Sequence, residues 1–247
     1  LAAREAQRAG QVRDVLLDLF RRSDPLQADT IGGKSASVWD SLDAAASEAR
    51  KQLADQPDIL AELLATLASL QSHAGQRTEA MSLLAESTDL YRTLATGHTA
   101  NVAINEAEYA NLLSVDDYAA AQTHLQSALD SLSDSTSVQP QVASSVWLDA
   151  GHIERAAGNA DQALEYYRQA AEALNQSTEQ NSSQRIEVLF SQADALLRLD
   201  DLQTAEPLLR EALALGEAQF GPDHSRLTGT LSALGQLERQ RGNYESS

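Results

Sequence analysis

The fold is decided by residues 147–170, which read WLDAGHIERAAGNADQALEYYRQA. Trp147 and Gly151 are four residues apart, and so are Ala163 and Tyr167. Residues at that spacing share one face of an α-helix, because a helix completes a turn every 3.6 residues. The stretch therefore predicts two amphipathic helices in succession.

A short break separates the two predicted helices at Gly158-Asn159. Glycine and asparagine tolerate the left-handed backbone that ends a helix. On either side of the break, the small residues Gly151 and Ala163 allow the helix backbones to approach closely. The large side chains of Trp147 and Tyr167 are then expected to fill the space beside them.

The same pattern recurs along the chain at a fixed period. Ala80, Ala121, Ala163 and Ala205 stand in the same local frame, and successive alanines are 41, 42 and 42 residues apart. A fixed period of this length predicts stacked copies of one small unit. The copy around Ala121 is one residue short in its turn between helices. One further period reaches Ser247, so we expect the sequence to stop within another repeat.

These copies resemble the tetratricopeptide repeat, whose signature places large and small residues at the same offsets. The resemblance implies an all-α fold, a right-handed α-α superhelix built as a tetratricopeptide-repeat solenoid. The period of 42 residues is longer than the usual one of about 34, and the repeats look like the long-period variant of kinesin light chains. The extra length is expected in the links Asn175–Ser183 and Phe220–Ser225, and Ser87 stands where alanine is usual.

The first part of the chain departs from the repeat pattern. We expect residues 1–52 to form an N-terminal helical cap or a degenerate first repeat, since the end of a solenoid must cover an exposed core. This part contains predicted helices at 2–21 and 36–53, with a polar loop at 26–35. Residues 53–247 are predicted to hold about four repeats and the first helix of another, truncated at the C-terminus.

A narrower resemblance covers residues 4–95. The stretches VRDVLLDLF at 12–20 and LADQP at 53–57 are similar to the carboxy-terminal repeat region of bacterial eukaryotic-like serine/threonine protein kinases. In those proteins a kinase domain and a membrane-spanning helix precede the repeats. The resemblance implies a sensory or scaffolding module on the extracytoplasmic side of a bacterial inner membrane. The alternative is the repeat domain of a cytoplasmic signalling ATPase or transcription regulator.

Composition narrows the classes of partner. The chain has 36 acidic and 18 basic residues, a net charge of −18, and no cysteine. Without cysteine there is no disulfide and no thiolate chemistry. Such an acidic chain repels nucleic acid and anionic lipid, both of which need clustered basic residues. No run of 18 apolar residues occurs, so we expect no direct membrane insertion.

Motifs for catalysis are missing from the sequence. The histidines lack the spacing of a helical zinc site, and no serine lies in a Gly-x-Ser-x-Gly elbow. Gly33-Lys34-Ser35 resembles the end of a phosphate-binding loop, but Ala28 stands where that loop needs glycine. Asp116-Asp117 and Asp200-Asp201 fall at turns between helices and are expected to cap them. We therefore predict no catalytic residues, metal or cofactor in this sequence.

The best candidate for a binding site is the surface that the first helices of the pairs line together. In tetratricopeptide-repeat proteins, which these repeats resemble, this surface is concave. Arg155, Arg198 and Arg239 would present one guanidinium per repeat, and guanidinium groups grip carboxylates bidentately. A protein or peptide ligand, acidic or bound by its C-terminus, is therefore expected. Alternatively, the arginines pair with nearby Glu154, Asp194 or Glu238 at little net energy. The complete predicted groove set is His73, Asn111, His152, Arg155, Asp194, Arg198, Gln236 and Arg239.

The last predicted helix suggests a second kind of contact. Leu231, Leu234 and Leu237 would form an apolar face on that helix. Contiguous exposed apolar surface favours association. We therefore expect homo-association of the chain through this end.

Overall fold

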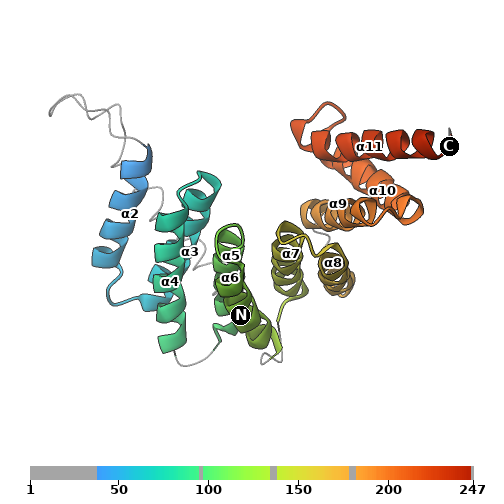
Figure 1. The fold of residues 1–247 in the computed structure, drawn as a ribbon. Coiled ribbons are helices and arrows are strands. Elements are labelled where there is room, and N and C mark those ends of the chain that lie inside the picture. Colours follow the sequence, from blue (N-terminus) through green and yellow to red (C-terminus); the bar gives the residue numbers. More distant parts are fainter. Residues whose placement is uncertain (1–37, 95–96, 134–137, 178–181, 246–247) are drawn as a thin grey trace. The chain divides into compact units, whose positions relative to one another are not determined.

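The computed structural model describes residues 38–94, 97–133, 138–177 and 182–245, and every regular element in these ranges is helical. Ten α-helices pack in antiparallel pairs there, which confirms the all-α fold class predicted from the repeats (Figure 1). The elements are α2 (Val38–Gln52), α3 (Pro57–His73), α4 (Arg77–Thr93), α5 (Thr99–Leu113), α6 (Tyr118–Ser133), α7 (Pro140–Ala156), α8 (Ala160–Asn175), α9 (Ser182–Arg198), α10 (Leu202–Phe220), the 3₁₀ turn η2 (Ser225–Leu227) and α11 (Thr228–Glu245).

The turns inside the helix pairs follow the sequence prediction. Gly75 and Gly158 have positive φ angles of 79° and 86°, and Asp200 takes the same left-handed conformation with φ 62° at the break between α9 and α10. After Gly158, the turn closes with a hydrogen bond from the backbone N–H of Asn159 to the carbonyl of Glu154, five residues back. The left-handed residue thus reverses the chain within a few residues, as in common helix C-caps.

The turn after α5, residues 114–117, closes with a shorter-range hydrogen bond than the turn at Gly158. The backbone N–H of Asp117 bonds to the carbonyl of Leu113, four residues back, at 2.8 Å. Asp117 Oδ1 then accepts from the backbone N–H of Ala120 at 3.0 Å, and Asp201 Oδ1 accepts from Thr204 at 3.1 Å. Both bonds satisfy a free N–H in the first turn of a helix, which confirms the predicted capping role of these aspartates.

The described residues divide between two compact units, 1–112 and 113–247, which we describe separately. In the first unit, α2 packs on α3 and α3 packs on α4 around a leucine- and alanine-rich core. Leu63, Leu64 and Leu67 are fully buried there. The predicted helix at 36–53 corresponds to α2. The predicted helix at 2–21 and the loop at 26–35 lie outside the described residues.

Ser87 stands where the repeat usually has alanine, and its hydroxyl has a structural role that the sequence did not indicate. Its side chain is fully buried on α4. The hydroxyl donates to the carbonyl of Ala61 on α3 at 2.7 Å and accepts from Nδ2 of Asn105 on α5 at 2.8 Å. One hydroxyl in place of the usual alanine thus joins three helices of the first unit.

The second unit contains the pairs α7/α8 and α9/α10, with α8 also packing on α9 and α11 on α10 (Figure 1). Gly151 on α7 lies directly against the ring of Tyr167 on α8, so that an added Cβ would overlap the ring carbons. Ala163 and Tyr167 are fully buried. The predicted close approach of α7 and α8, with Tyr167 filling the remaining space, is confirmed.

The apolar face predicted on α11 is smaller than expected. Leu237 is fully buried in the core of the second unit, and Leu234 is partly buried against it. Leu231 is exposed, at 49%. The prediction placed all three leucines on a free face, because an unfinished repeat array was expected to expose the apolar face meant for its next helix. Among the described residues, no helix is long and apolar enough to cross a membrane.

Candidate functional site

In the second unit, α7 and α9 are each the first helix of a pair, and they bring four of the predicted groove residues together. His152 and Arg155 are three residues apart on α7, and Asp194 and Arg198 are four residues apart on α9, so each pair shares a helix face. The two helices meet at this level, where His152 Nε2 lies 3.3 Å from the hydroxyl of Ser191 on α9.

His152 is neutral at physiological pH because of its surroundings. Its ring packs edge-on against Tyr167, with 5.6 Å between ring centroids. Burial and, to a smaller extent, the charge of Arg155 lower the pKa of His152 to about 4, although Asp194 acts in the opposite direction. Loss of solvent and the nearby guanidinium both disfavour the imidazolium form. His152 therefore contributes a hydrogen-bonding edge and no positive charge.

Tyr167 is fully buried next to these polar groups. Burial raises the pKa of its phenol to about 12, and the charges of Arg155, Asp194 and Arg198 also act on it. The nearby Arg155 guanidinium lowers the pKa of Tyr167, against the effect of burial. The buried Tyr167 hydroxyl has no hydrogen-bond partner of normal geometry among the described residues. We call His152, Arg155, Tyr167, Asp194 and Arg198 the arginine cluster.

The ion pairs within the cluster leave one guanidinium without a carboxylate. Arg198 Nε donates to Asp194 Oδ2 at 3.0 Å, as the alternative from the sequence foresaw. Arg155 makes no salt bridge to any residue that the structure describes. With two guanidinium groups, one carboxylate and a neutral imidazole, the cluster carries one net positive charge.

Glu154, the carboxylate next to Arg155 in sequence, is engaged elsewhere. Its side chain is buried, and the Tyr118 hydroxyl of α6 donates to its Oε2 at 2.8 Å. The side-chain amide of Asn159 donates to the same oxygen at 2.7 Å. Glu154 therefore joins α6 to α7 and the following turn. For this reason Glu154 does not pair with Arg155, and that part of the alternative reading from the sequence is not seen in the structure.

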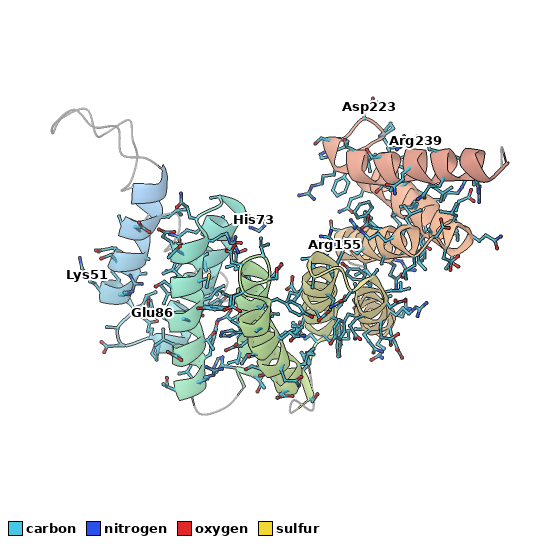
Figure 2. The ribbon with its side chains drawn as sticks, viewed as in Figure 1. Lys51, His73, Glu86, Arg155, Asp223 and Arg239 are labelled. Carbon is cyan, nitrogen blue, oxygen red and sulfur yellow. The ribbon has the colours of Figure 1, made fainter. Side chains whose placement is uncertain are left out.

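The remaining predicted residues of the second unit lie on α11. Gln236 and Arg239 are both exposed. Figure 2 labels Arg155 on α7 and Arg239 on α11. None of the interactions of the described residues joins Gln236 or Arg239 to the arginine cluster. A guanidinium ladder running from Arg155 to Arg239 stays a prediction.

The first unit holds the other two predicted residues. His73 is exposed in the last turn of α3, and its Nδ1 lies 2.7 Å from the carbonyl of Ser69, to which it donates (Figure 2). Asn111 lies on α5 and is partly buried. Burial raises the pKa of Glu108, also on α5, and the nearby His73 lowers it. His73 therefore lies near α5, the helix that carries Asn111.

Some residues around the arginine cluster could not be assigned from the sequence. Ser191 has no distinguishing pattern, and its contact with His152 spans 39 residues. Tyr167 was expected only as core, although its hydroxyl lies among the charged groups. Within the described ranges, no group of histidine and acidic side chains is arranged to hold a metal ion.

Comparison with known proteins identifies the repeats. The tetratricopeptide repeat family matches residues 142–218 and 184–247. The structure of BtubC (BKLC) from P. vanneervenii, a kinesin light chain-like repeat protein, superposes with a TM-score of 0.70 and 19% identity, covering 83% of each chain. The MamA RS-1 ArsTM double mutant gives a TM-score of 0.50 and 13% identity, covering 86% of this chain and 97% of its own. No curated protein sequence matches the chain.

These matches agree with the fold derived above. Residues 142–247 match the tetratricopeptide repeat family, and the chain shares its helical repeat fold with BtubC. Such repeats are generally scaffolds for protein–protein interaction, and their helical fold is typically non-catalytic. For residues 142–247, which match the family, this general description agrees with the expected role as a protein-binding scaffold. The solved structures, at 19% and 13% identity, show the fold alone.

Proposed function

We propose that the second unit binds an acidic peptide segment of a partner protein, with the arginine cluster as its central contact. The observation that carries this proposal is Arg155, which has no salt bridge among the described residues and lies beside a second guanidinium and a neutral histidine. A carboxylate of the ligand would supply the missing counter-charge. Hydrogen bonds between charged partners are roughly twice as strong as neutral ones.

The surroundings of the cluster favour a peptide over a small ion. His152 presents a neutral ring edge that packs against the buried ring of Tyr167, so the guanidinium of Arg155 has a partly apolar neighbour. Charge–charge interactions are stronger where water is partly excluded. Gln236 and Arg239 on α11 are proposed as additional peptide contacts of the second unit. His73 and Asn111 are proposed separately as ligand contacts of the first unit.

A selection from a displayed library of random 12-residue peptides tests the chemistry of the ligand. We expect the chain to enrich peptides rich in Asp and Glu. The double variant Arg155→Glu/Arg198→Glu should lose this enrichment. Arg168→Glu is the matched control, because Arg168 lies on the second helix α8, is exposed and pairs only loosely with Glu165 at 3.7 Å. Enrichment of basic peptides, or the same peptides on the double variant, would contradict the proposal.

The biological setting that we propose is the repeat region of a bacterial transmembrane serine/threonine kinase. The support is the resemblance of residues 4–95, of which 4–37 and 95 lie outside the described residues. Sequencing the coding region upstream of residue 1 tests it directly. A kinase domain followed by an apolar span is the expected result, whereas a nucleotide-binding ATPase or DNA-binding domain would contradict the proposal.

A further inference from the structure

A pocket separate from the arginine cluster opens between α9, the end of α10, η2 and the start of α11. Its volume is about 330 Å³, at the small end of the range for ligand sites. Glu187 on its rim precedes Arg198 by eleven residues on α9, which is about 16 Å along the helix axis. The lining includes Ile186, Glu187, Phe190, Phe220, Leu227 and Gly229.

The walls of the pocket are aromatic and aliphatic. Two of the three phenylalanines of the chain, Phe190 and Phe220, are among its lining residues. Aromatic ring faces attract cations, and aliphatic walls suit the methylene stem of a long side chain. Gly229 keeps the pocket open on the α11 side, because a Cβ there would reach van der Waals contact with Phe190, 3.5 Å from Cζ.

Glu187 gives the pocket an anionic group that lacks a counter-charge. Its carboxylate makes no salt bridge with any described residue. Glu187 is exposed to solvent on one side, while partial desolvation raises its pKa, and no charged neighbour is among the causes of this shift. A carboxylate at the edge of an aromatic and aliphatic pocket attracts a bound cation.

Arg226, which also lines the pocket, does not supply the counter-charge of Glu187. Its guanidinium lies over the ring of Phe220, with Cζ 5.2 Å from the ring centroid. The charge of Arg226 does not act on Glu187, whose pKa responds to desolvation alone. The carboxylate and this guanidinium therefore lie apart on the rim. The carboxylate remains available to a ligand.

We propose that this pocket binds a basic side chain of a partner protein, with the aliphatic stem against Phe190 and Leu227 and the charged head at Glu187. Lysine or arginine fits because each combines an apolar stem with a terminal cation. The net charge of −18 draws basic partners toward the surface. The proposal does not depend on the acidic-peptide function of the arginine cluster, because the two sites share no residue.

The test uses the whole chain, labelled with ¹⁵N, and two short peptides that differ only in charge. Acetyl-Gly-Lys-Gly-amide is titrated against the norleucine analogue, which keeps the stem and removes the ammonium group. The amide signals of Gly229 and Thr230 report on the pocket. We expect saturable shifts with the lysine peptide and at least fivefold weaker binding of the norleucine peptide.

Three variants test whether the lysine peptide binds in this pocket. Glu187→Gln should reduce lysine binding to the norleucine level, and Gly229→Leu should abolish it by filling the pocket while circular dichroism shows that the helices remain. Arg226→Gln should leave lysine binding unchanged or tighter. The proposal is overturned if no shifts appear, if norleucine or glutamate peptides bind as well as lysine, or if Arg155→Glu rather than Glu187→Gln removes binding.

Discussion

At the scale of single residues, the packing of Gly151 connects the repeat signature to the candidate site. The missing side chain at Gly151 makes room for Tyr167, and Tyr167 in turn supports the ring of His152. A residue that the repeat requires for packing thus determines where a surface group lies. The spacing of Gly151 and Tyr167 was readable from the sequence, because both positions follow from helix periodicity.

Gly151→Ala should destabilise the second unit by about 1–3 kcal/mol, the usual cost of overpacking a core. The new Cβ would lie 2.9 Å from Tyr167 Cζ and closer still to two other ring carbons, so the ring must move. Urea unfolding measures the change. Gly242→Ala on α11 is the control, since nothing lies within 4 Å of its Cβ position. Equal stability of both variants would contradict this account of the packing.

The buried neutral form of His152 predicts a loss of stability in acid. The folded-state pKa of about 4 lies below the value of about 6.5 in the unfolded chain. Between these two values the unfolded state binds more protons, so the free energy of unfolding rises with pH there and falls as the pH drops from 6.5 to 4. The contribution is up to about 3 kcal/mol.

Urea unfolding at pH 7 and pH 5 measures this effect, and His152→Gln provides the comparison. The variant should lose less stability than the parent chain on going to pH 5, since its side chain does not titrate. An NMR titration of the His152 ring gives the folded-state pKa directly. A value near 6.5 would show that the ring is not buried as described.

At the scale of helices, the pairs are joined by polar side chains that span about one repeat. Tyr118 on α6 and Glu154 on α7 are 36 residues apart, and Gln184 on α9 donates to the Ser145 hydroxyl on α7 across 39 residues. The first bond joins the second helix of one pair to the first helix of the next, and the second bond joins two first helices within the second unit. Because Glu154 is used in this way, Arg155 is left for a ligand.

Tyr118→Phe should therefore destabilise the chain by about 1–3 kcal/mol, because it removes a donor from the buried Glu154 carboxylate. The change keeps the ring and its packing. Thermal and urea unfolding measure the loss. Gln169→Ala is the control, since Gln169 is partly exposed and its side-chain amide bonds Glu165 on its own helix at 3.2 Å. A variant as stable as the control would mean that the carboxylate is hydrated instead.

The sequence was sufficient for local features and insufficient for contacts between helices. The turn at Gly158 and the capping by Asp117 and Asp201 depend on residues at most five positions apart, so periodicity and residue type predicted them. The engagement of Glu154 by Tyr118 depends on side chains from different repeats, which carry no mark in either helix alone. The pocket around Phe190 and Phe220 escaped prediction for the same reason.

At the scale of the whole molecule, a locally positive cluster lies in a chain of net charge −18. The cluster and the basic-side-chain pocket both belong to the unit formed by residues 113–247. In repeat proteins each repeat contacts only its neighbours, so part of an array can keep its structure. Association of the chain through α11 stays a prediction, with Leu231 as its exposed contact.

Residues 113–247 expressed alone should stay helical and bind an enriched acidic peptide within about threefold of the affinity of the whole chain. Circular dichroism and calorimetric titration give the two values. A helical fragment that binds tenfold more weakly would show that the first unit, with His73 and Asn111, supplies a main part of the site.

The central claim is that the arginine cluster binds a carboxylate-bearing peptide. The most direct measurement is the dissociation constant of one enriched acidic peptide for the parent chain, Arg155→Glu/Arg198→Glu and Arg168→Glu, by calorimetry at fixed salt. We predict at least tenfold weaker binding for the double variant and no more than a twofold change for Arg168→Glu, since two charge-assisted hydrogen bonds are each worth about 1.5–3 kcal/mol. Equal affinities for the parent chain and the double variant would contradict the claim.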